Sequence, residues 1–383
     1  MKITGIICEY NPLHLGHKKQ LDIIKAQMGA DSGIVCLMSG NFVQRGAPAI
    51  MDKSLRAKAA ILSGADLVLE LPVTAALSSA EGFAYQGVSI LSPFCDTLCF
   101  GAETAGKAQL LTTAQMLLSP GFPQALREEL DKGISFPAAR QAALQAMGGN
   151  GALLAQPNNI LAVEYCKAIL RTGSRMEPMP ILRQGSYHDT VADPENPSAT
   201  SIRSLIFHSG AWLDYIPEAA RPCCQDAVLH TLAAGERAIL GKLRTMTESE
   251  FESLPYGSEG LWRKLMHAVH TEASLEDILT AVKSKRYTRT RLDRMVMCAY
   301  LGLTEQTLQS PAPYVRVLAF NDNGRRILNK ARETGHFPNI GEAQDDPYQQ
   351  FETRCDDLYG LFAAGAPAPA GQDSRRRVYY HHN

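Results

Sequence analysis

Short apolar runs alternate with amphipathic, helix-forming segments over the first half of the chain, and this alternation limits the possible folds more than any other feature. The runs rich in β-forming residues are Lys2–Cys8, Gly33–Ser39, Ala65–Pro72, Asp96–Glu103 and Met179–Gly185. Strands that are apolar along their whole length and alternate with helices are typical of a parallel sheet covered by helices on both faces. We therefore predict an α/β fold built on such a sheet.

The sequence pattern changes near residue 210. Beyond this point helix-forming runs dominate, and the next strand candidate is Tyr314–Phe320. The last residues are rich in alanine, proline and glycine and then in arginine, which favours a mobile terminus. We predict an α/β domain over residues 1–209, a mostly helical domain over 210–362 and a flexible tail over 363–383.

Composition excludes several classes of protein. The formal net charge is -1, so nucleic-acid binding would require a local basic patch rather than a basic protein as a whole. The nine cysteines form no C-x-x-C pair, which argues against a zinc knuckle or a thioredoxin-type site and favours buried thiols. No apolar run reaches the roughly 18 residues of a membrane span, and the chain starts without a secretory-type segment. We expect a reduced, cytoplasmic protein with no membrane partner.

The segment "NPLHLGH" follows the first predicted strand and precedes a helix. Ligands bind at the carboxyl ends of parallel strands, and a helix N-terminus offers unpaired N–H groups that suit phosphate. Gly16 permits close approach of a ligand to the backbone, and His14 and His17 would lie together on the first helical turn. Imidazole N–H groups can stabilise the charge of a leaving pyrophosphate. Asn11 would brace the loop, and Lys18 would add positive charge.

Two other interpretations of this segment stay open. An isolated H-x-G-H is more often a turn capped by solvent-exposed histidines. A zinc site is disfavoured, because the pair supplies only two ligands and no further ligand cluster accompanies it. The position of the motif on the first strand-to-helix turn of an α/β pattern favours a phosphate site.

Three later segments combine possible ligand contacts with ordinary structural roles. "FGAE" ends the fourth strand candidate, where Gly101 is either a simple turn or a point of close ligand approach. Asn158 and Asn159 either cap the following helix or contact a ligand, and one side chain can do both. "SATSIR" is either an ordinary helix start or, through Ser201 and Arg203, a second phosphate motif.

Two further groups of polar residues have open assignments. Arg183, at the end of the fifth strand candidate, either contacts a phosphate or forms a surface ion pair with a nearby carboxylate. The long loop after the second strand candidate carries Asn41, Gln44 and Arg45, on the same predicted rim as the histidines. These three residues either bind acetate, an acyl phosphate or RNA, or belong to a purely structural loop.

The run "KSKRYTRTRLDR" is strongly basic and contains a tyrosine. Such a run is often no more than a solvated helix face. In a chain of nearly neutral net charge, local basicity beside an aromatic ring is what binding to RNA phosphates requires. The candidate residues for contact with a tRNA backbone are Lys283, Lys285, Arg286, Arg289 and Arg291.

Beyond these single motifs, the segment "GIICEYNPLHLGH" resembles the nucleotidylyltransferase superfamily, whose H-x-G-H motif cradles the triphosphate of ATP. More narrowly, most of the chain is similar to the tRNA(Met) cytidine acetate ligase family. The other segments that carry this resemblance are "MSGNFVQRGAPAIMDKSLRAKAAILSGADLVLELP", "FGAE", "QPNNILAVEY", "SATSIR" and "KSKRYTRTRLDRM". The resemblance implies a Rossmann-like parallel sheet of the nucleotidylyltransferase type, followed by a mostly helical domain that binds tRNA.

The resemblance also assigns site residues, position by position. His14 and His17 would be the catalytic, phosphate-binding histidines, and we add Lys18 to the catalytic residues for its positive charge. The residues that would contact ATP are Ile7, Cys8, Glu9, Tyr10, Asn11, Pro12, Leu13, His14, Leu15, Gly16, His17, Lys18, Lys19, Gln20, Gly101, Asn158, Arg183, Ser201 and Arg203. No residue is assigned to a metal, and Mg²⁺ would be bound through the phosphates of ATP. Leu15 stands where many relatives have asparagine, so that side chain carries no argument.

The function that the resemblance implies is a two-step ligase reaction. Acetate and ATP would form acetyl-adenylate with release of pyrophosphate, and the acetyl group would then pass to the wobble cytidine of elongator tRNA(Met). The products would be N4-acetylcytidine and AMP. Two alternatives stay open: an adenylyltransferase acting on a small phosphorylated metabolite, and a non-catalytic RNA-binding protein that senses ATP.

Overall fold

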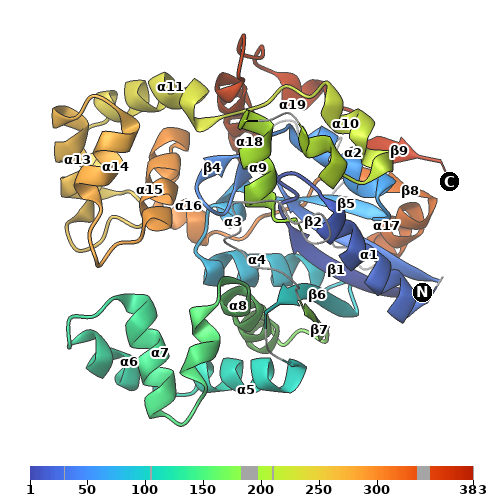
Figure 1. Cartoon of the computed structure of the whole chain (residues 1–383), viewed down its shortest axis with the longest axis horizontal. Helices are drawn as coiled ribbons and strands as arrows, with labels where there is room; N and C mark the ends of the chain where they lie inside the picture. Colours follow the sequence, from blue (N-terminus) through green and yellow to red (C-terminus); the bar gives the residue numbers. More distant parts are fainter. Residues whose placement is uncertain (30, 104–105, 183–196, 209–210, 334–345, 383) are drawn as a thin grey trace.

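The computed structural model describes residues 1–29, 31–103, 106–182, 197–208, 211–333 and 346–382. Its centre is a seven-stranded sheet with the strand order β7–β6–β1–β2–β5–β8–β9 (Figure 1). The strands of this sheet are β1 (Lys2–Cys8), β2 (Ser32–Ser39), β5 (Leu67–Leu71), β6 (Thr97–Ala102), β7 (Glu177–Leu182), β8 (Val317–Asn321) and β9 (Tyr379–His381). The strands from β7 to β5 run parallel, whereas β8 runs antiparallel to β5 and parallel to β9. The predicted α/β sheet is confirmed.

The remaining elements are mostly helices. The helices of the first half are α1 (Leu15–Met28), α2 (Lys53–Leu62), α3 (Val73–Ala76), α4 (Ala80–Leu91), α5 (Lys107–Leu118), α6 (Phe122–Leu130), α7 (Phe136–Ala146) and α8 (Pro157–Thr172). Those that follow are α9 (Ala199–His208), α10 (Arg221–Gln225), α11 (Leu232–Thr245), α12 (Glu248–Glu252), α13 (Leu261–Thr271), α14 (Leu275–Val282), α15 (Arg289–Leu301), α16 (Glu305–Gln309), α17 (Asp322–Glu333), α18 (Pro347–Tyr359) and α19 (Gln372–Arg375). A short hairpin of β3 (Phe42–Val43) and β4 (Ala47–Pro48) follows β2. The 3₁₀ turns are η1 (Gly151–Ala155), η2 (Ala211–Tyr215), η3 (Glu218–Ala220) and η4 (Gly360–Phe362).

Successive side chains of the central strands enter two different cores, because side chains alternate between the two faces of a strand. Ile3, Val35 and Leu37 pack with α4, α5 and α8 on one face. Ile6 and Cys36 pack with α1 and α2 on the other face. The central strands therefore carry apolar residues on both faces, which is the pattern that predicts a parallel sheet.

Helices α11 to α16 form a helical group on one side of the sheet, from the upper left to the centre of Figure 1. Most of this group shares a core of its own, with Leu243, Leu265 and Met295 among its buried residues. Phe42 of β3 and Leu77 beside α3 belong to the same core. The helical group is therefore packed against the hairpin and α3 rather than tethered by a linker.

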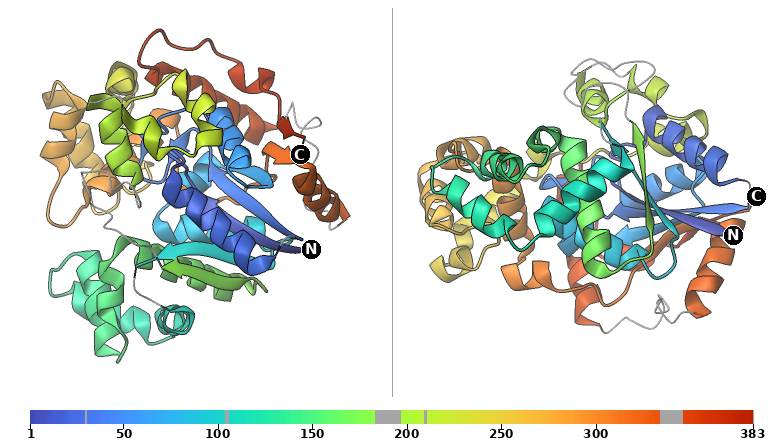
Figure 2. Two further views of the ribbon diagram at one scale, coloured as in Figure 1. Left: turned by 45° about the vertical axis from the view of Figure 1, so that its right-hand side comes forward. Right: turned by 90° about the horizontal axis from the view of Figure 1, so that it is seen from below.

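The sheet combines strands from all three segments into which the sequence divides the chain. β8 pairs with β5, and β9, from the expected flexible tail, pairs with β8. Both chain ends lie on the same side of the molecule (Figure 2). A composition rich in alanine and proline favours mobility only where nothing buries the chain, and here Asp373 is buried. The structure thus differs from the expectation of a flexible tail over 363–383, because residues up to 382 are described and pack onto the fold.

A buried network of ion pairs attaches these C-terminal residues to the sheet. Nζ of Lys53, at the start of α2, lies 2.8 Å from a carboxylate oxygen of Glu70, 2.9 Å from Asp373 and 3.3 Å from Asp356. The other members of the network are Arg316, Arg376 and Asp52. Burial works to lower the pKa of Lys53, but the carboxylates together raise it above its ordinary value. The network therefore stays charged.

Glu352 of α18 lies beside this network, accepts a hydrogen bond from the backbone N–H of Val73 and gives a testable pH dependence. Burial, together with the Glu70 carboxylate, raises the pKa of Glu352 from its ordinary 4.5 to about 7. Between these values the folded protein keeps a proton that the unfolded chain releases, so stability falls as the pH rises through this window. Glu352→Gln should therefore gain stability relative to the wild type across the window, by on the order of 1–3 kcal/mol.

Urea unfolding at several pH values measures this difference. The exposed Glu248 offers a control, since Glu248→Gln should stay close to the wild type at every pH. A difference between Glu352→Gln and the wild type that does not change with pH would contradict the prediction.

Two expectations from composition can be compared with the structure. No helix in the described part of the chain combines the length and the hydropathy needed to cross a bilayer. The cysteines are all unpaired thiols, and all except Cys8 are buried. The expectation of buried thiols is thus met, apart from partly exposed Cys8.

Candidate functional site

A cavity of about 570 Å³ opens where the strand order reverses. From β1 the chain continues outward through β2 and β5, and β6 then returns to the other side of β1. Ligands of open α/β sheets bind at such a point, beyond the carboxyl ends of the strands. Cys8 at the end of β1 and Gly101 near the end of β6 both line the cavity. The topology thus brings together two segments that the sequence singles out.

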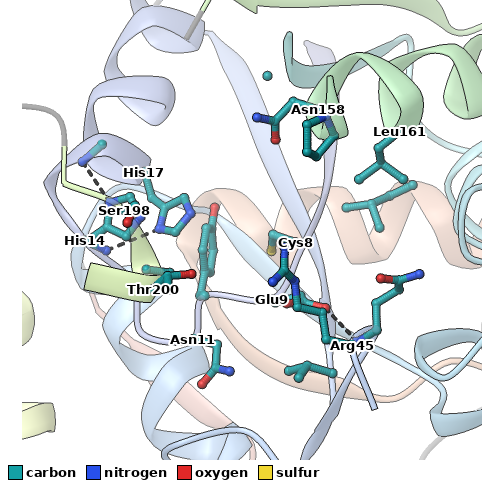
Figure 3. Close-up of a pocket in the computed structure, with 18 of the residues that line it drawn as sticks. Cys8, Glu9, Asn11, His14, His17, Arg45, Asn158, Leu161, Ser198 and Thr200 are labelled. Carbon is teal, nitrogen blue, oxygen red and sulfur yellow. Dashed lines mark hydrogen bonds between the residues drawn. The ribbon is translucent and has the colours of Figure 1, made fainter. Parts of the chain in front are cut away.

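The two histidines form one wall of this cavity (Figure 3). His14 is the buried N-cap of α1, and its Nδ1 accepts the backbone N–H of Gly16 at 3.1 Å. Nδ1 of His17 accepts the backbone N–H of His14 at 3.3 Å, and the ring centroids lie 3.7 Å apart. A ring nitrogen that accepts a hydrogen bond carries no proton, so each neutral ring holds its proton on Nε2. The pair is therefore arranged to donate hydrogen bonds from Nε2.

Close packing holds both rings in this orientation. A Cβ atom at Gly16 would lie 3.0 Å from Cε1 of His14, so a larger residue would press on the ring. Tyr10 has a φ of 44°, in the left-handed region, and its ring packs edge-on against His17 with a centroid distance of 4.9 Å. Left-handed backbone is uncommon for a bulky residue and points to a constrained loop.

Asn11 and Arg56 join the loops that follow β1 and β2. Oδ1 of Asn11 accepts the backbone N–H of Ile50 at 2.7 Å, which confirms the bracing role expected of Asn11. The guanidinium of Arg56 is buried and donates to the backbone carbonyls of Glu9 and Gly40, among others. A buried cation whose N–H groups are satisfied by carbonyl oxygens fixes the loops that supply them.

The start of α9 forms the wall beside the two rings. Ser198 and Thr200 line the cavity there (Figure 3). Nη1 of Arg203 donates to the backbone carbonyl of Asn11 at 2.7 Å, and Nη2 donates to Oγ1 of Thr200 at 3.2 Å. Ser201, by contrast, is fully buried, and its hydroxyl donates to the carbonyl of Ser198 at 2.9 Å. The structure thus puts Ser198 and Thr200 where the sequence prediction puts Ser201.

Glu103 organises the start of α8 at the other end of the cavity. Its carboxylate accepts the backbone N–H groups of Asn158 and Asn159, at 3.1 and 2.9 Å. The side-chain amide of Asn158 also donates to Glu103, at 2.7 Å, and Asn158 lines the cavity. Asn159 is fully buried and accepts the backbone N–H of Glu103. Asn158 therefore supports the helix start and faces the cavity, whereas Asn159 has a structural role.

Comparisons with known proteins agree with this arrangement. The model of the HIGH Nucleotidyl Transferase family matches residues 1–373. The tRNA(Met) cytidine acetate ligase of Clostridium novyi (strain NT) is 38% identical over 357 residues, which cover 88% of this chain and 89% of the relative. That of Caldicellulosiruptor saccharolyticus is 39% identical over 349 residues, 87% of this chain and 86% of the relative. This chain belongs to the tRNA(Met) cytidine acetate ligase family.

Solved structures of the family show the same fold. The apo crystal structure of Thermotoga maritima TmcAL matches with a TM-score of 0.91 at 28% identity, covering 100% of both chains. The form of that protein bound with alpha-thio ATP matches with a TM-score of 0.87 over the same coverage. The resemblance drawn from the sequence is therefore confirmed.

Most of the ATP contacts that the family resemblance implies line the cavity. They are Ile7, Cys8, Glu9, Tyr10, Asn11, His14, Gly16, His17, Lys19, Gln20, Gly101, Asn158 and Arg203. Pro12, Leu13 and Leu15 do not line it, and Leu13 is instead buried among the side chains beneath α1. Arg183 lies outside the described residues.

Lys18, expected to be catalytic, does not line the cavity either. Its ammonium group pairs with Asp22, one turn further along α1. Successive residues of a helix point about 100° apart, so the face that carries Lys19 and Gln20 toward the cavity turns Lys18 away from it. The catalytic role expected of Lys18 stays a prediction, and Lys19 is the lysine of this segment that lines the cavity.

The hairpin after β2 brings Gln44 and Arg45 to the same cavity. The backbone N–H of Gln44 donates to the Glu9 carboxylate at 2.7 Å. Gly46, with a φ of 77°, packs against the backbone of α15, and a Cβ there would lie 2.4 Å from it. Asn41 is turned into the ion-pair network, where its amide donates to a carboxylate. Of the three loop residues that the sequence singles out, two line the cavity and one is structural.

Sequence reasoning missed the aromatic part of the wall, which includes Phe100, Tyr165 and Phe207. One signal was available, because Thr200, Arg203 and Phe207 are spaced by three and four residues and so lie on one face of α9. His230 also lines the cavity, and no motif surrounds it in the sequence.

The basic run that the sequence assigns to tRNA lies before and within α15, in the helical group. Arg286 pairs with Glu259 and Arg289 with Glu276, each with a nitrogen–oxygen distance of 2.7 Å. Tyr287 is buried, so its ring is not placed to stack on a base. The three remaining candidates for tRNA contact are exposed or half-buried: Lys283, Lys285 and Arg291. Exposed ion pairs contribute only about 0–1 kcal/mol, so phosphates can replace these carboxylates.

Proposed function

We propose that this protein is a tRNA-modifying ligase that activates acetate with ATP and acetylates the wobble cytidine of elongator tRNA(Met) to N4-acetylcytidine. The observation that carries the proposal is the stacked pair of His14 and His17, on the wall of a cavity at the switch point of the sheet. Support comes from relatives named tRNA(Met) cytidine acetate ligase and from Thermotoga maritima TmcAL, which binds alpha-thio ATP. The reaction takes place in the cytoplasm, where ATP and tRNA are found.

The first step needs positioning and neutralisation of charge rather than a nucleophilic side chain. An oxygen of acetate attacks the α-phosphorus of ATP, and pyrophosphate leaves with the electron pair of the broken P–O bond. His14, His17 and Arg203 line the cavity where this charge would be stabilised, beside the N-terminus of α1. Lys19, which lines the cavity, is a further cation near these groups.

Mg²⁺ enters this scheme with ATP. In the described part of the chain, no group of three or more His, Cys, Asp and Glu residues is arranged to hold a metal ion. Mg²⁺ keeps several waters and is commonly bound through substrate phosphates with one or two carboxylates. When bound to ATP it would neutralise charge on the phosphate oxygens. Among the described residues that line the cavity, Glu9 supplies a carboxylate.

One assay separates this function from its rivals. The protein is incubated with labelled acetate, ATP and total tRNA, and the tRNA is digested to nucleosides. Labelled acetylcytidine is the expected result. If pyrophosphate exchanges into ATP at the same rate with and without acetate, the protein would instead be an adenylyltransferase for a small phosphorylated metabolite. Binding of tRNA without any turnover would indicate an RNA-binding protein that senses ATP.

The helical group, and within it the basic run, is the proposed tRNA-binding surface. Replacing Arg286 and Arg289 by glutamate should weaken tRNA binding and make it less dependent on salt, because fewer counterions are released. Each lost phosphate contact lowers the slope of log K against log salt by about 1. Filter binding over a salt series measures this, and acetate-dependent pyrophosphate release should persist. A salt slope equal to that of the wild type would remove this surface from the proposal.

A further inference from the structure

His230 lies on the same rigid frame as the histidine pair, although it is far from it in the sequence. Its backbone N–H donates to the carbonyl of Ile50 at 2.9 Å, and the N–H of Ile50 donates to Oδ1 of Asn11 at 2.7 Å. His230 also forms an isolated antiparallel bridge with Ala363. Two hydrogen bonds therefore connect it to the loop that carries His14, and it lines the same cavity.

The imidazole of His230 packs against an aromatic ring on one face and forms a hydrogen bond through one nitrogen. The residue is only 7% exposed, and its ring stacks on Tyr359 with a centroid distance of 4.0 Å and an interplanar angle of 16°. Nδ1 lies 3.1 Å from the backbone carbonyl of Val228. A carbonyl can only accept, so Nδ1 carries the proton of this hydrogen bond and Nε2 is left with its lone pair.

Nε2 of His230 is different from the buried polar atoms of the core. Among the described residues this atom has no hydrogen-bond partner. It is nevertheless accessible to solvent, because it is absent from the buried polar atoms that lack a partner. A histidine that serves packing alone has both nitrogens satisfied or lies at the surface. Nε2 of His230 is therefore open to solvent, in a residue that lines the cavity.

The surroundings keep this ring neutral. Burial lowers the pKa of His230, the carboxylate of Asp52 opposes this, and the guanidinium groups of Arg376 and Arg56 reinforce it. Tyr359 is the other ionisable residue packed on the ring. The remaining ionisable groups that line the cavity are Cys8, Glu9, Tyr10, His14, His17, Lys19, Arg45, Tyr165 and Arg203.

We infer that His230 is the general base of the acetyl-transfer step, an inference that rests on the proposed function. The exocyclic amine of cytidine attacks the carbonyl carbon of acetyl-adenylate, so that a C–N bond forms and the C–O bond to the phosphate breaks. AMP leaves with the electron pair of that bond. One amine proton passes to Nε2 of His230 and from there to solvent. No other reactant is needed.

The histidine pair cannot fill this role. His14 and His17 accept backbone N–H groups at Nδ1, so their Nε2 atoms carry protons and act as donors. His230 has the opposite tautomer, with the proton on Nδ1 and the lone pair on Nε2. The cavity thus has two imidazoles that donate from Nε2 and one imidazole that can accept a proton there. Release of pyrophosphate needs a donor, and deprotonation of the amine needs an acceptor.

The test uses His230→Asn, because the amide nitrogen of asparagine can replace Nδ1 toward Val228 while nothing replaces Nε2. We expect acetyl transfer to tRNA, followed in a single turnover from preformed enzyme-bound acetyl-adenylate, to slow by about 10²–10⁴-fold. Acetate-dependent exchange of pyrophosphate into ATP should stay within about 2-fold of the wild type, since general-base help acts only in the second step. The transfer rate of the wild type should fall toward acid pH, and the variant should lack that fall.

A matched control is His208→Asn. Nδ1 of His208 also bonds a backbone carbonyl, that of Ser204, but this residue is exposed and does not line the cavity. Both reactions of this variant should resemble the wild type. Equal slowing of pyrophosphate exchange and transfer in His230→Asn would overturn the inference, as would an unchanged transfer rate.

The wild type provides a measurement that does not depend on the variant folding. A wild-type transfer rate that stays constant down to the pH of unfolding would exclude a neutral histidine base. Absence of acetylcytidine from wild-type reactions would refute the proposed function itself, which is a separate outcome.

Discussion

Replacing His17 by alanine is expected to slow the formation of acetyl-adenylate by about 10²–10³-fold. The variant loses the Nε2–H donor at the place where the negative charge of pyrophosphate develops. The measurement is acetate-dependent exchange of labelled pyrophosphate into ATP. The affinity for tRNA should remain nearly unchanged, because the basic run lies in the helical group and not on the cavity wall.

Alanine at this position also removes a helix cap, so a second variant is needed. Nδ1 of His17 accepts the N–H of His14, and loss of such a cap costs about 1 kcal/mol of stability. His17→Asn keeps an acceptor near the position of Nδ1 but has nothing in place of Nε2. It should therefore be as slow as His17→Ala while unfolding closer to the wild type. Normal exchange in His17→Asn would show that only the cap matters, and a parallel loss of tRNA binding in His17→Ala would contradict the separation of the two sites.

The sheet and the place of the site follow from the sequence for a simple physical reason. Side chains of Lys2–Cys8 and Ser32–Ser39 alternate between two cores, so both strands carry apolar residues on both faces, and this pattern can be recognised from the sequence alone. The histidine segment then falls at the carboxyl end of the first strand, where parallel sheets bind ligands.

The sequence does not predict which side chains of that segment point toward the cavity. Lys18 and Lys19 are neighbours of identical chemistry, and only the rotation of α1 decides that Lys19 lines the cavity. Ser198 and Ser201 form hydrogen bonds with each other, and the one nearer the helix start remains at the cavity wall. His230 reaches the site through contacts with residues near 50 and 363, and such long-range pairing leaves no local pattern.

The C-terminal segment shows the same limitation. Its alanine, proline and glycine content predicts mobility, because local composition contains no information about a distant partner. The partner is Lys53, more than three hundred residues earlier, whose buried charge needs the Asp373 carboxylate. Burial works to raise the pKa of Asp373, but Lys53 and Arg316 hold it well below its ordinary range.

Lys53→Met is expected to lower the free energy of unfolding by about 3–5 kcal/mol. Methionine fills a similar volume but leaves the carboxylates of Glu70, Asp356 and Asp373 buried with one cation fewer. Urea unfolding measures the change. Lys242→Met is the matched control, since Lys242 pairs with Glu250 at the surface and should change stability by about 1 kcal/mol at most.

The same substitution should loosen the C-terminal segment before it unfolds the sheet. β9 is short and lies at the sheet edge, so it depends on the ion pairs of the preceding turn to remain in place. Trypsin should therefore cleave Lys53→Met after the arginines at 375–377 faster than it cleaves the wild type or Lys242→Met.

Asp373→Asn combined with Lys53→Met should lower the free energy of unfolding by less than the sum of the single changes, because both act on one ion pair. Additive effects, or equal cleavage of all three proteins, would mean that the ion pairs do not hold the segment.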